Sequence, residues 1–162
     1  MVKSPTVKEV LEFLQGAAPA SLAENWDNPG LQVGFPDRPL QALLSALDPS
    51  VSVIEQASSK GAGLVVTHHP LFFKPLSSLV LDMFPGDVVK AAVSRGISLV
   101  SLHTNLDSAR NGISDALAEM IGLRDVEVLE ESRKDEGVGL GRIGNLPEAE
   151  ILEKIFARIK TS

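Results

Sequence analysis

The stretch LVVTHHPLFF (residues 64–73) places two adjacent histidines directly after an apolar run and before a proline. Short apolar runs of this length are typical of strands buried in a sheet. The chain has only three histidines, and the third, His103, follows a similar run in ISLVSLHTNLD (residues 97–107). The sequence therefore predicts two buried strands that each end at a histidine.

The segments on either side alternate between helix and strand patterns. Thr6 and Glu9 form a capping-box pattern at the start of the first helix, and we expect Asp48 to cap the second, with Pro49 at its first position. Helices are predicted at residues 6–16, 49–60 and 85–95, and from about Ser108 or Asn111 to Met120. Strands are predicted near 31–33 and at 63–67 and 97–103, and we interpret the short apolar run at 40–47 as a buried strand. This alternation is typical of an α/β fold with a mostly parallel or mixed sheet flanked by helices.

Polar residues at the strand ends are candidates for a metal site. In open sheets, ligands bind beyond the carboxyl ends of parallel strands, so we expect His68, His69 and His103 to converge there. Asp107 lies four residues after His103 and joins the same cluster. Neutral imidazole and carboxylate bind zinc, manganese, iron or a similar divalent ion. The structural alternative is that each histidine binds a backbone carbonyl, while Asp107 or Ser108 caps a helix.

Composition excludes several classes of protein. The chain has 162 residues, 44% of them apolar, which suits one domain or slightly more. It has no apolar run long enough to cross a membrane and no signal-peptide pattern at its start. It contains no cysteine, which suits a reducing compartment, and we expect a cytoplasmic protein. The net charge of −6 without a basic stripe disfavours nucleic acid as a partner.

Two other stretches have competing interpretations. GLGRIG (residues 139–144) matches a dinucleotide-binding pattern, but it follows the charged stretch EESRKDE (residues 130–136) rather than an apolar strand. We interpret it as a strand whose glycines allow close approach, and EESRKDE as an exposed linker between lobes.

In ENWDN (residues 24–28), the favoured interpretation is that Trp26 is an aromatic anchor flanked by the loop-forming residues Asp27 and Asn28. The alternative places Glu24 or Asn28 beside the metal cleft. Phe72 and Phe73 either roof an apolar pocket beside the histidines or pack into the core.

Four motifs together resemble a known family. They are ENWDNPGLQVG (24–34), THHPLFF (67–73), SLHTNLDSARNGISDALAE (101–119) and GLGRIGNLPE (139–148). In this order they resemble the Nif-three-like family, whose members are also called GTP cyclohydrolase I type 2 homologues or dinuclear metal centre hexameric proteins. The resemblance implies a two-lobed α/β fold, a ring-like homohexamer and two divalent ions per subunit. It matches His68, His69 and Asp107 to metal-ligand positions, and His103 to a histidine that orients a ligand or binds more weakly.

The sequence departs from that family near its end. Family members carry a later histidine and glutamate that complete the dinuclear site, whereas this chain has no histidine after His103. The run ILEKIFARI (151–159) has an apolar stripe at helical spacing and no strand after it. We expect residues 1–123 to form an N-terminal α/β metal-binding lobe and residues 124–162 to begin a second, truncated α/β lobe.

Three functions follow as hypotheses. The first is a metal-dependent hydrolase acting on a small molecule, with the GTP cyclohydrolase label implied by resemblance alone and no catalytic residue assigned. The second is a non-enzymatic metal-binding or interaction protein that works as an oligomeric ring. The third is a metal-free remnant that lacks the later ligands.

Overall fold

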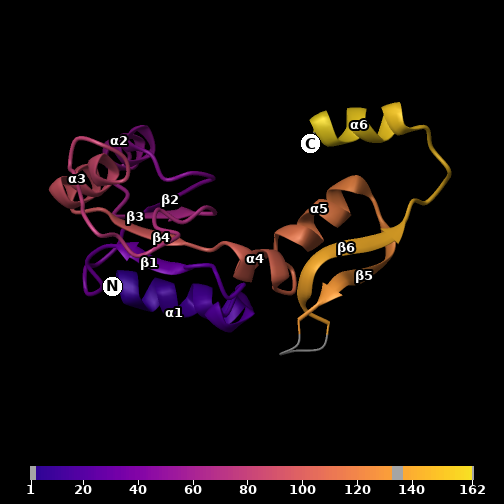
Figure 1. Cartoon of the computed structure of the whole chain (residues 1–162), viewed down its shortest axis with the longest axis horizontal. Helices are drawn as coiled ribbons and strands as arrows, with labels where there is room; N and C mark the ends of the chain where they lie inside the picture. Colours follow the sequence, from indigo (N-terminus) through magenta and orange to yellow (C-terminus); the bar gives the residue numbers. More distant parts are fainter. Residues whose placement is uncertain (1–2, 133–136, 162) are drawn as a thin grey trace.

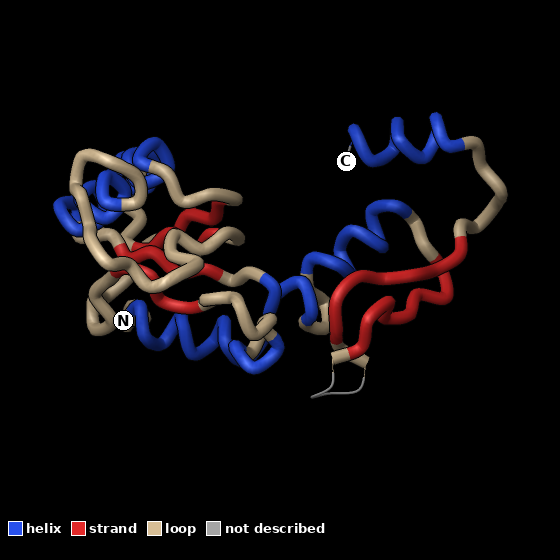
Figure 2. The backbone as a smooth tube through the Cα atoms, in the orientation of Figure 1, coloured by secondary structure: helices blue, strands red, loops and turns tan. Residues whose placement is uncertain are grey.

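The computed structural model describes residues 3–132 and 137–161 of the chain. Its larger sheet has the order β1-β4-β3-β2 (Figure 1), and Figure 2 shows the strands in red between the blue helices. The strands are β1 (Gly30–Val33), β2 (Leu43–Ala46), β3 (Leu64–Thr67) and β4 (Ser98–Ser101). β2, β3 and β4 are parallel, while β1 runs antiparallel to β4. The expected α/β fold with a mixed sheet is confirmed.

Helices cover both faces of this sheet. The helices α2 (Val51–Ser59) and α3 (Gly86–Arg95) pack on one face, and α1 (Val7–Ala17) packs on the other (Figure 1). Successive side chains of a strand point to opposite faces, so β3 contributes Val65 to the core under α2 and α3, and Leu64 to the core under α1. Both side chains are fully buried. The apolar runs of β3 and β4 therefore reflect strands that are covered on both sides.

The predicted start of α1 is confirmed, because Thr6 and Glu9 form a complete capping box. Two other local predictions are wrong. The run at 40–47 is an edge strand rather than a buried one, and Leu43 is 53% exposed. Asp48 does not cap α2, because the Ser50 hydroxyl accepts the Val53 N–H at 3.3 Å instead. The carboxylate of Asp48 is engaged elsewhere, by a histidine ring described below.

The segment after β4 contains two helices where one was predicted. A short helix, α4 (Thr104–Ser108), comes first, and α5 (Ile113–Ile121) begins after Gly112. A 3-10 turn, η1 (Ala20–Leu22), contacts α4. Gly122 ends α5 in a left-handed conformation, as glycine does at many helix C-termini.

The rest of the chain forms a hairpin and a helix. β5 (Arg124–Glu131) pairs antiparallel with β6 (Gly139–Asn145), and α6 (Leu152–Thr161) follows. The prediction of a glycine-bearing strand is confirmed: a Cβ on Gly139 would lie 2.0 Å from the Glu130 carbonyl oxygen. The predicted linker is wrong at Glu130 and Glu131, which belong to β5, and residues 133–136 lie outside the described residues.

Helices α4 and α5 precede residue 123 in the chain, yet they pack against β6, which follows it (Figure 1). The division into lobes at residues 1–123 and 124–162 stays a prediction. Within the described part of the chain, every helix is too short or too polar to cross a bilayer.

Candidate metal centre

Polar residues that flank each of the four strands lie at one edge of the larger sheet, where β2, β3 and β4 end. The last residues of β2, β3 and β4 lie side by side, because Ala46 pairs with Thr67 and Thr67 pairs with Ser101. The antiparallel β1 starts at this same edge, where Gly30 pairs with Ser101. Asp27 precedes β1, Asp48 follows β2, His68 and His69 follow β3, and His103 follows β4.

The three histidines converge in the structure as the sequence predicts. One ring nitrogen from each of them lies within 4.8 Å of the other two. The ring centroids of His68 and His103 are 4.9 Å apart, and those of His69 and His103 are 5.6 Å apart. All three side chains are only partly buried, so the group stands at the surface end of the sheet, within reach of a ligand.

Each of the three rings uses its Nδ1 atom in a contact with an oxygen. Nδ1 of His68 lies 3.1 Å from the carbonyl oxygen of Leu102. Nδ1 of His69 lies 2.6 Å from Oδ1 of Asp48, and Nδ1 of His103 lies 2.9 Å from Oδ1 of Asp27. Carbonyl and carboxylate oxygens only accept hydrogen bonds, so each neutral ring carries its proton on Nδ1. The lone pair of each ring is then on Nε2.

Asp107 lies next to this group, on α4. Its Oδ1 is 3.8 Å from Nε2 of His68, and both side chains are about one-fifth exposed, at 23% and 18%. The alternative role as a helix cap is wrong for Asp107 and Ser108, because His103 is the N-cap residue of α4 and Gly112 that of α5. The carbonyl-bonding alternative holds for one of the histidines, His68.

Asp27 is a functional candidate that the sequence interpretation missed. Its carboxyl group is fully buried and accepts hydrogen bonds from His103, from the Asn28 N–H at 2.7 Å, and from both the N–H and the hydroxyl of Thr104. Burial alone raises the pKa of Asp27, but the hydrogen bonds from Thr104 and His103 outweigh it and leave the pKa below its ordinary value. Asp27 is therefore a carboxylate at neutral pH.

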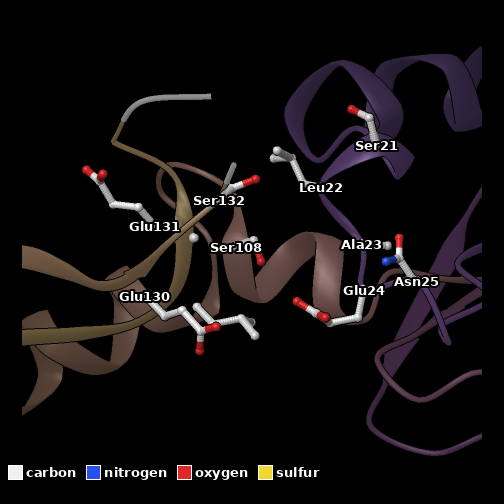
Figure 3. Close-up of a pocket in the computed structure, with 11 residues that line it drawn as sticks. Ser21, Leu22, Ala23, Glu24, Asn25, Ser108, Glu130, Glu131 and Ser132 are labelled. Carbon is white, nitrogen blue, oxygen red and sulfur yellow. The ribbon is translucent and has the colours of Figure 1, made fainter. Parts of the chain in front are cut away.

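The other residues of ENWDN take different places. Trp26 is 59% exposed, so the anchor interpretation is wrong; its ring stands edge-on to His103, with centroids 5.9 Å apart. Asn28 donates its side-chain amide to the Phe72 carbonyl at 2.8 Å. Glu24 lines a cavity of about 400 Å³ with Ser108, Glu130 and others, and none of the histidines lines that cavity (Figure 3).

The two phenylalanines beside the histidines have different roles. Phe72 packs against the main core, as one of the two interpretations expected. Phe73 is 47% exposed, and its ring meets His103 edge-on with centroids 5.6 Å apart. Phe73 also lines two cavities, of about 390 and 410 Å³, one of which includes His69 and the other Asp27. An apolar pocket beside the histidines is thus present.

Comparison with known proteins agrees with the motifs. The chain is 34% identical over 157 residues to a GTP cyclohydrolase 1 type 2 homolog of Clostridium acetobutylicum, covering 96% of this chain and 59% of that protein. A protein of the same description from Methanocaldococcus jannaschii is 41% identical over 138 residues, 85% of this chain and 53% of its own length. The chain therefore spans only part of the length of these relatives.

Solved structures share the fold. The reduced HcgD protein of Methanocaldococcus jannaschii has 36% identity and a TM-score of 0.83, over 99% of this chain and 61% of its own. The Staphylococcus aureus protein SA1388 has 25% identity and a TM-score of 0.87, over 97% of this chain and 64% of its own. The family model of Duf34/NIF3 (NGG1p interacting factor 3) matches residues 5–162, and the chain belongs to this family.

Proposed function

We propose that this chain binds a divalent cation through Nε2 of His68, His69 and His103 together with the carboxylate of Asp107. One observation carries the proposal: every histidine ring is held at Nδ1 by an oxygen acceptor, which leaves Nε2 available as a ligand. Histidines that bind metals are commonly held in this way, and the acceptor fixes both the tautomer and the orientation of the ring. His103 is held at Nδ1 in the same way as His68 and His69, so we propose it as a ligand equal to them.

The donor set fits the cation that the family resemblance implies. Three neutral imidazoles and one carboxylate are ligands for zinc, manganese or iron, and the chain has no thiolate that would favour a softer ion. Asp48 and Asp27 hold two of the imidazoles at Nδ1, which fixes the orientation of their Nε2 atoms. The four donors described here suit one ion better than the two that the resemblance implies.

We infer a hydrolase-type reaction as the activity of this centre. When bound, a divalent cation polarises a carbonyl or phosphoryl oxygen and lowers the pKa of a coordinated water. The chain itself keeps the proton of each imidazole on Nδ1, which donates it to the Leu102 carbonyl or to the carboxylate of Asp48 or Asp27. The names of the relatives suggest a cyclohydrolase, but nothing among the residues selects GTP, and we propose the reaction class without a substrate.

A second candidate is a metal-binding protein that works through assembly. Several large apolar side chains of α6 are exposed, including Leu152 at 64% and Phe156 at 56%. Exposed apolar surface of this kind favours association with another protein surface. We therefore propose self-association, with the hexamer of the family resemblance as the expected form, in a cytoplasmic protein.

Metal titration of the chelator-treated protein tests the proposal. We expect binding of zinc or manganese with fewer than two ions per chain after dialysis, measured by calorimetry and elemental analysis. Replacing all three histidines by alanine should abolish binding, whereas Asp37→Asn, at an exposed loop position, should leave it unchanged. Failure of the wild-type chain to retain any metal would refute the proposal and favour the metal-free hypothesis.

An activity screen separates the two functions. Phosphoesters, nucleotides and GTP are incubated with the protein, with and without added manganese or zinc. Turnover that depends on the metal and is lost with the histidines supports the hydrolase. Firm metal binding without turnover of any of these compounds favours the assembly protein.

A further inference from the structure

We propose that the cavity beside His69 receives a flat, uncharged apolar ring of the molecule that acts at the metal centre. The proposal rests on the proposed function, because it places the ring beside His69, one of the proposed metal ligands. The cavity has a volume of about 390 Å³ and is lined by Asp48, Pro49, His69, Pro70, Phe73 and Phe84. This volume lies within the range of small-molecule sites in proteins.

The chemistry of the lining defines the class of ligand. Four of the six side chains are the hydrocarbon rings of Pro49, Pro70, Phe73 and Phe84. Lysine and arginine are absent from this lining, so an anionic group placed here would lose its hydration without gaining a partner. Aromatic rings pack well against other aromatic rings, in stacked or edge-to-face arrangements. The lining therefore suits an uncharged aromatic ring.

The two polar side chains of the lining contact each other. Oδ1 of Asp48 lies 2.6 Å from Nδ1 of His69. The rest of the lining consists of proline and phenylalanine side chains, which form no hydrogen bonds. Polar groups on most of the edge of a heteroaromatic base would therefore lose water without gaining a partner here, and this favours a hydrocarbon ring.

The position of Phe73 and Phe84 supports a ligand site rather than a core. Phe73 is 47% exposed and Phe84 is 65% exposed, although both are large aromatic side chains. Phe73 also contacts the edge of His103, so the apolar wall continues directly into the group of histidines. Exposed aromatic surface around a concave site with polar groups at one end is the usual arrangement of a small-molecule pocket.

Two hydroxamates test this arrangement. Benzohydroxamate and acetohydroxamate present the same metal-binding group, but one carries a phenyl ring and the other a methyl group. On the metal-loaded protein, we expect benzohydroxamate to bind about tenfold more tightly, which corresponds to about 1.4 kcal/mol. Calorimetry measures both affinities, and elemental analysis measures the metal content of each sample.

Single substitutions in the lining test whether the preference for benzohydroxamate comes from this cavity. Phe73→Ala and Phe84→Ala should each bring the two affinities close to equality, while acetohydroxamate binding and metal content stay near those of the wild type. Phe13→Ala is the matched control, because Phe13 is an exposed phenylalanine on α1 that is not part of the lining. It should keep the tenfold preference.

The outcomes separate the two proposals. Equal affinities for both hydroxamates on a metal-loaded wild-type protein would overturn the ring site and leave the metal centre standing. A preference that survives in both Phe73→Ala and Phe84→Ala would overturn it as well. Absence of bound metal, with neither hydroxamate binding, would overturn the proposed function and the ring site together.

Discussion

Two aspartates fix the orientation of two histidine rings, those of His69 and His103, at the sheet edge. Asp48 is 65% exposed and holds the ring of His69, whereas Asp27 is fully buried and holds the ring of His103. Both face the Nδ1 side of their imidazole, so they act on the orientation of Nε2 rather than as ligands in the proposed site. Their different burial predicts different consequences when each is removed.

Asp48→Ala should weaken metal binding by about tenfold to a hundredfold, because it removes the acceptor that holds His69. Stability without metal should stay close to that of the wild type, since the side chain is exposed.

Asp27→Ala should weaken metal binding by a similar factor. It should also lower the free energy of unfolding by about 1–3 kcal/mol, because buried N–H and hydroxyl groups of Thr104 lose their partner. Calorimetry and urea unfolding in chelator measure the two effects. Equal stability loss in both variants would contradict this explanation.

Asp107→Asn tests the one carboxylate proposed as a ligand. The substitution removes a negative charge while keeping the size of the side chain, so metal affinity should fall at least about tenfold, or about 1.4 kcal/mol. Stability in chelator should change little, because Asp107 caps no helix and its backbone N–H still bonds to the His103 carbonyl. Titration calorimetry beside a thermal melt measures both. Asp37→Asn is the control, and an affinity like that of the wild type would remove Asp107 from the site.

The sequence could predict the histidines but not their aspartates. A histidine directly after an apolar run is a local signal, and parallel strand ends meet at a known edge, so the convergence of His68 and His103 followed from the pattern. The aspartates are paired across 76 residues for Asp27 and 21 residues for Asp48. Asp residues are also common in turns and caps, which is how both were interpreted. A search for acidic residues at every strand end would have found them.

At the scale of elements, the sequence pattern could not predict that β1 runs antiparallel to its neighbour β4. The strand itself was predictable near Leu31, but its partner β4 lies about 70 residues later in the chain, and β1 has no turn that would set its direction. The antiparallel pairing carries Asp27 to the same edge as the histidines. Helix ends were easier to predict, because Gly96 and Gly122 mark them with left-handed conformations.

An ion pair joins α5 to β6. Arg142 on β6 is only 4% exposed and donates from Nε and Nη2 to the carboxylate of Asp115 on α5. The same guanidinium also donates to the carbonyl oxygens of Gly139 and Gly141. These hydrogen bonds from Arg142 lower the pKa of Asp115 below its ordinary value of 3.8. A lowered carboxyl pKa means that the folded state favours the ionised form.

The pH dependence of stability follows from this sign. The contribution of Asp115 is complete above its ordinary pKa and is lost as the pH falls through the lowered value. Asp115→Asn should therefore reduce the free energy of unfolding by about 2 kcal/mol at neutral pH, and the difference from the wild type should shrink under acidic conditions. Urea unfolding across the pH range measures it, with Asp37→Asn as control. A difference that is constant with pH would refute the role of the ion pair.

At the scale of the whole molecule, α6 leaves an apolar face uncovered in the single chain. Arg158 fixes the helix by donating to the Ile121 carbonyl at 2.6 Å and to the carboxylate of Glu150. Leu152, Phe156 and Ile159 are nevertheless each at least 50% exposed. The helical spacing of the apolar residues predicts the stripe, but the spacing does not identify the surface that packs against it.

Self-association through α6 can be weakened by one charge. We expect the wild-type chain to associate as its concentration rises, and Phe156→Asp to shift it towards the monomer, because a carboxylate is costly to bury in an apolar contact. Light scattering over a concentration series measures the change. Phe13→Asp, at a phenylalanine that is 75% exposed on α1, should not alter the assembly. A wild-type chain that stays monomeric throughout would contradict the proposal.

The meeting of four strand ends at one edge has a mechanical consequence. Asp27 and Asp48 hold His103 and His69, so an ion bound to the histidines ties together segments that precede β1 and follow β2, β3 and β4. The proposed cation would then act as a non-covalent cross-link over the width of the sheet. Separating the ends of these strands would then require breaking a bond to the ion or one of the two aspartate–histidine contacts.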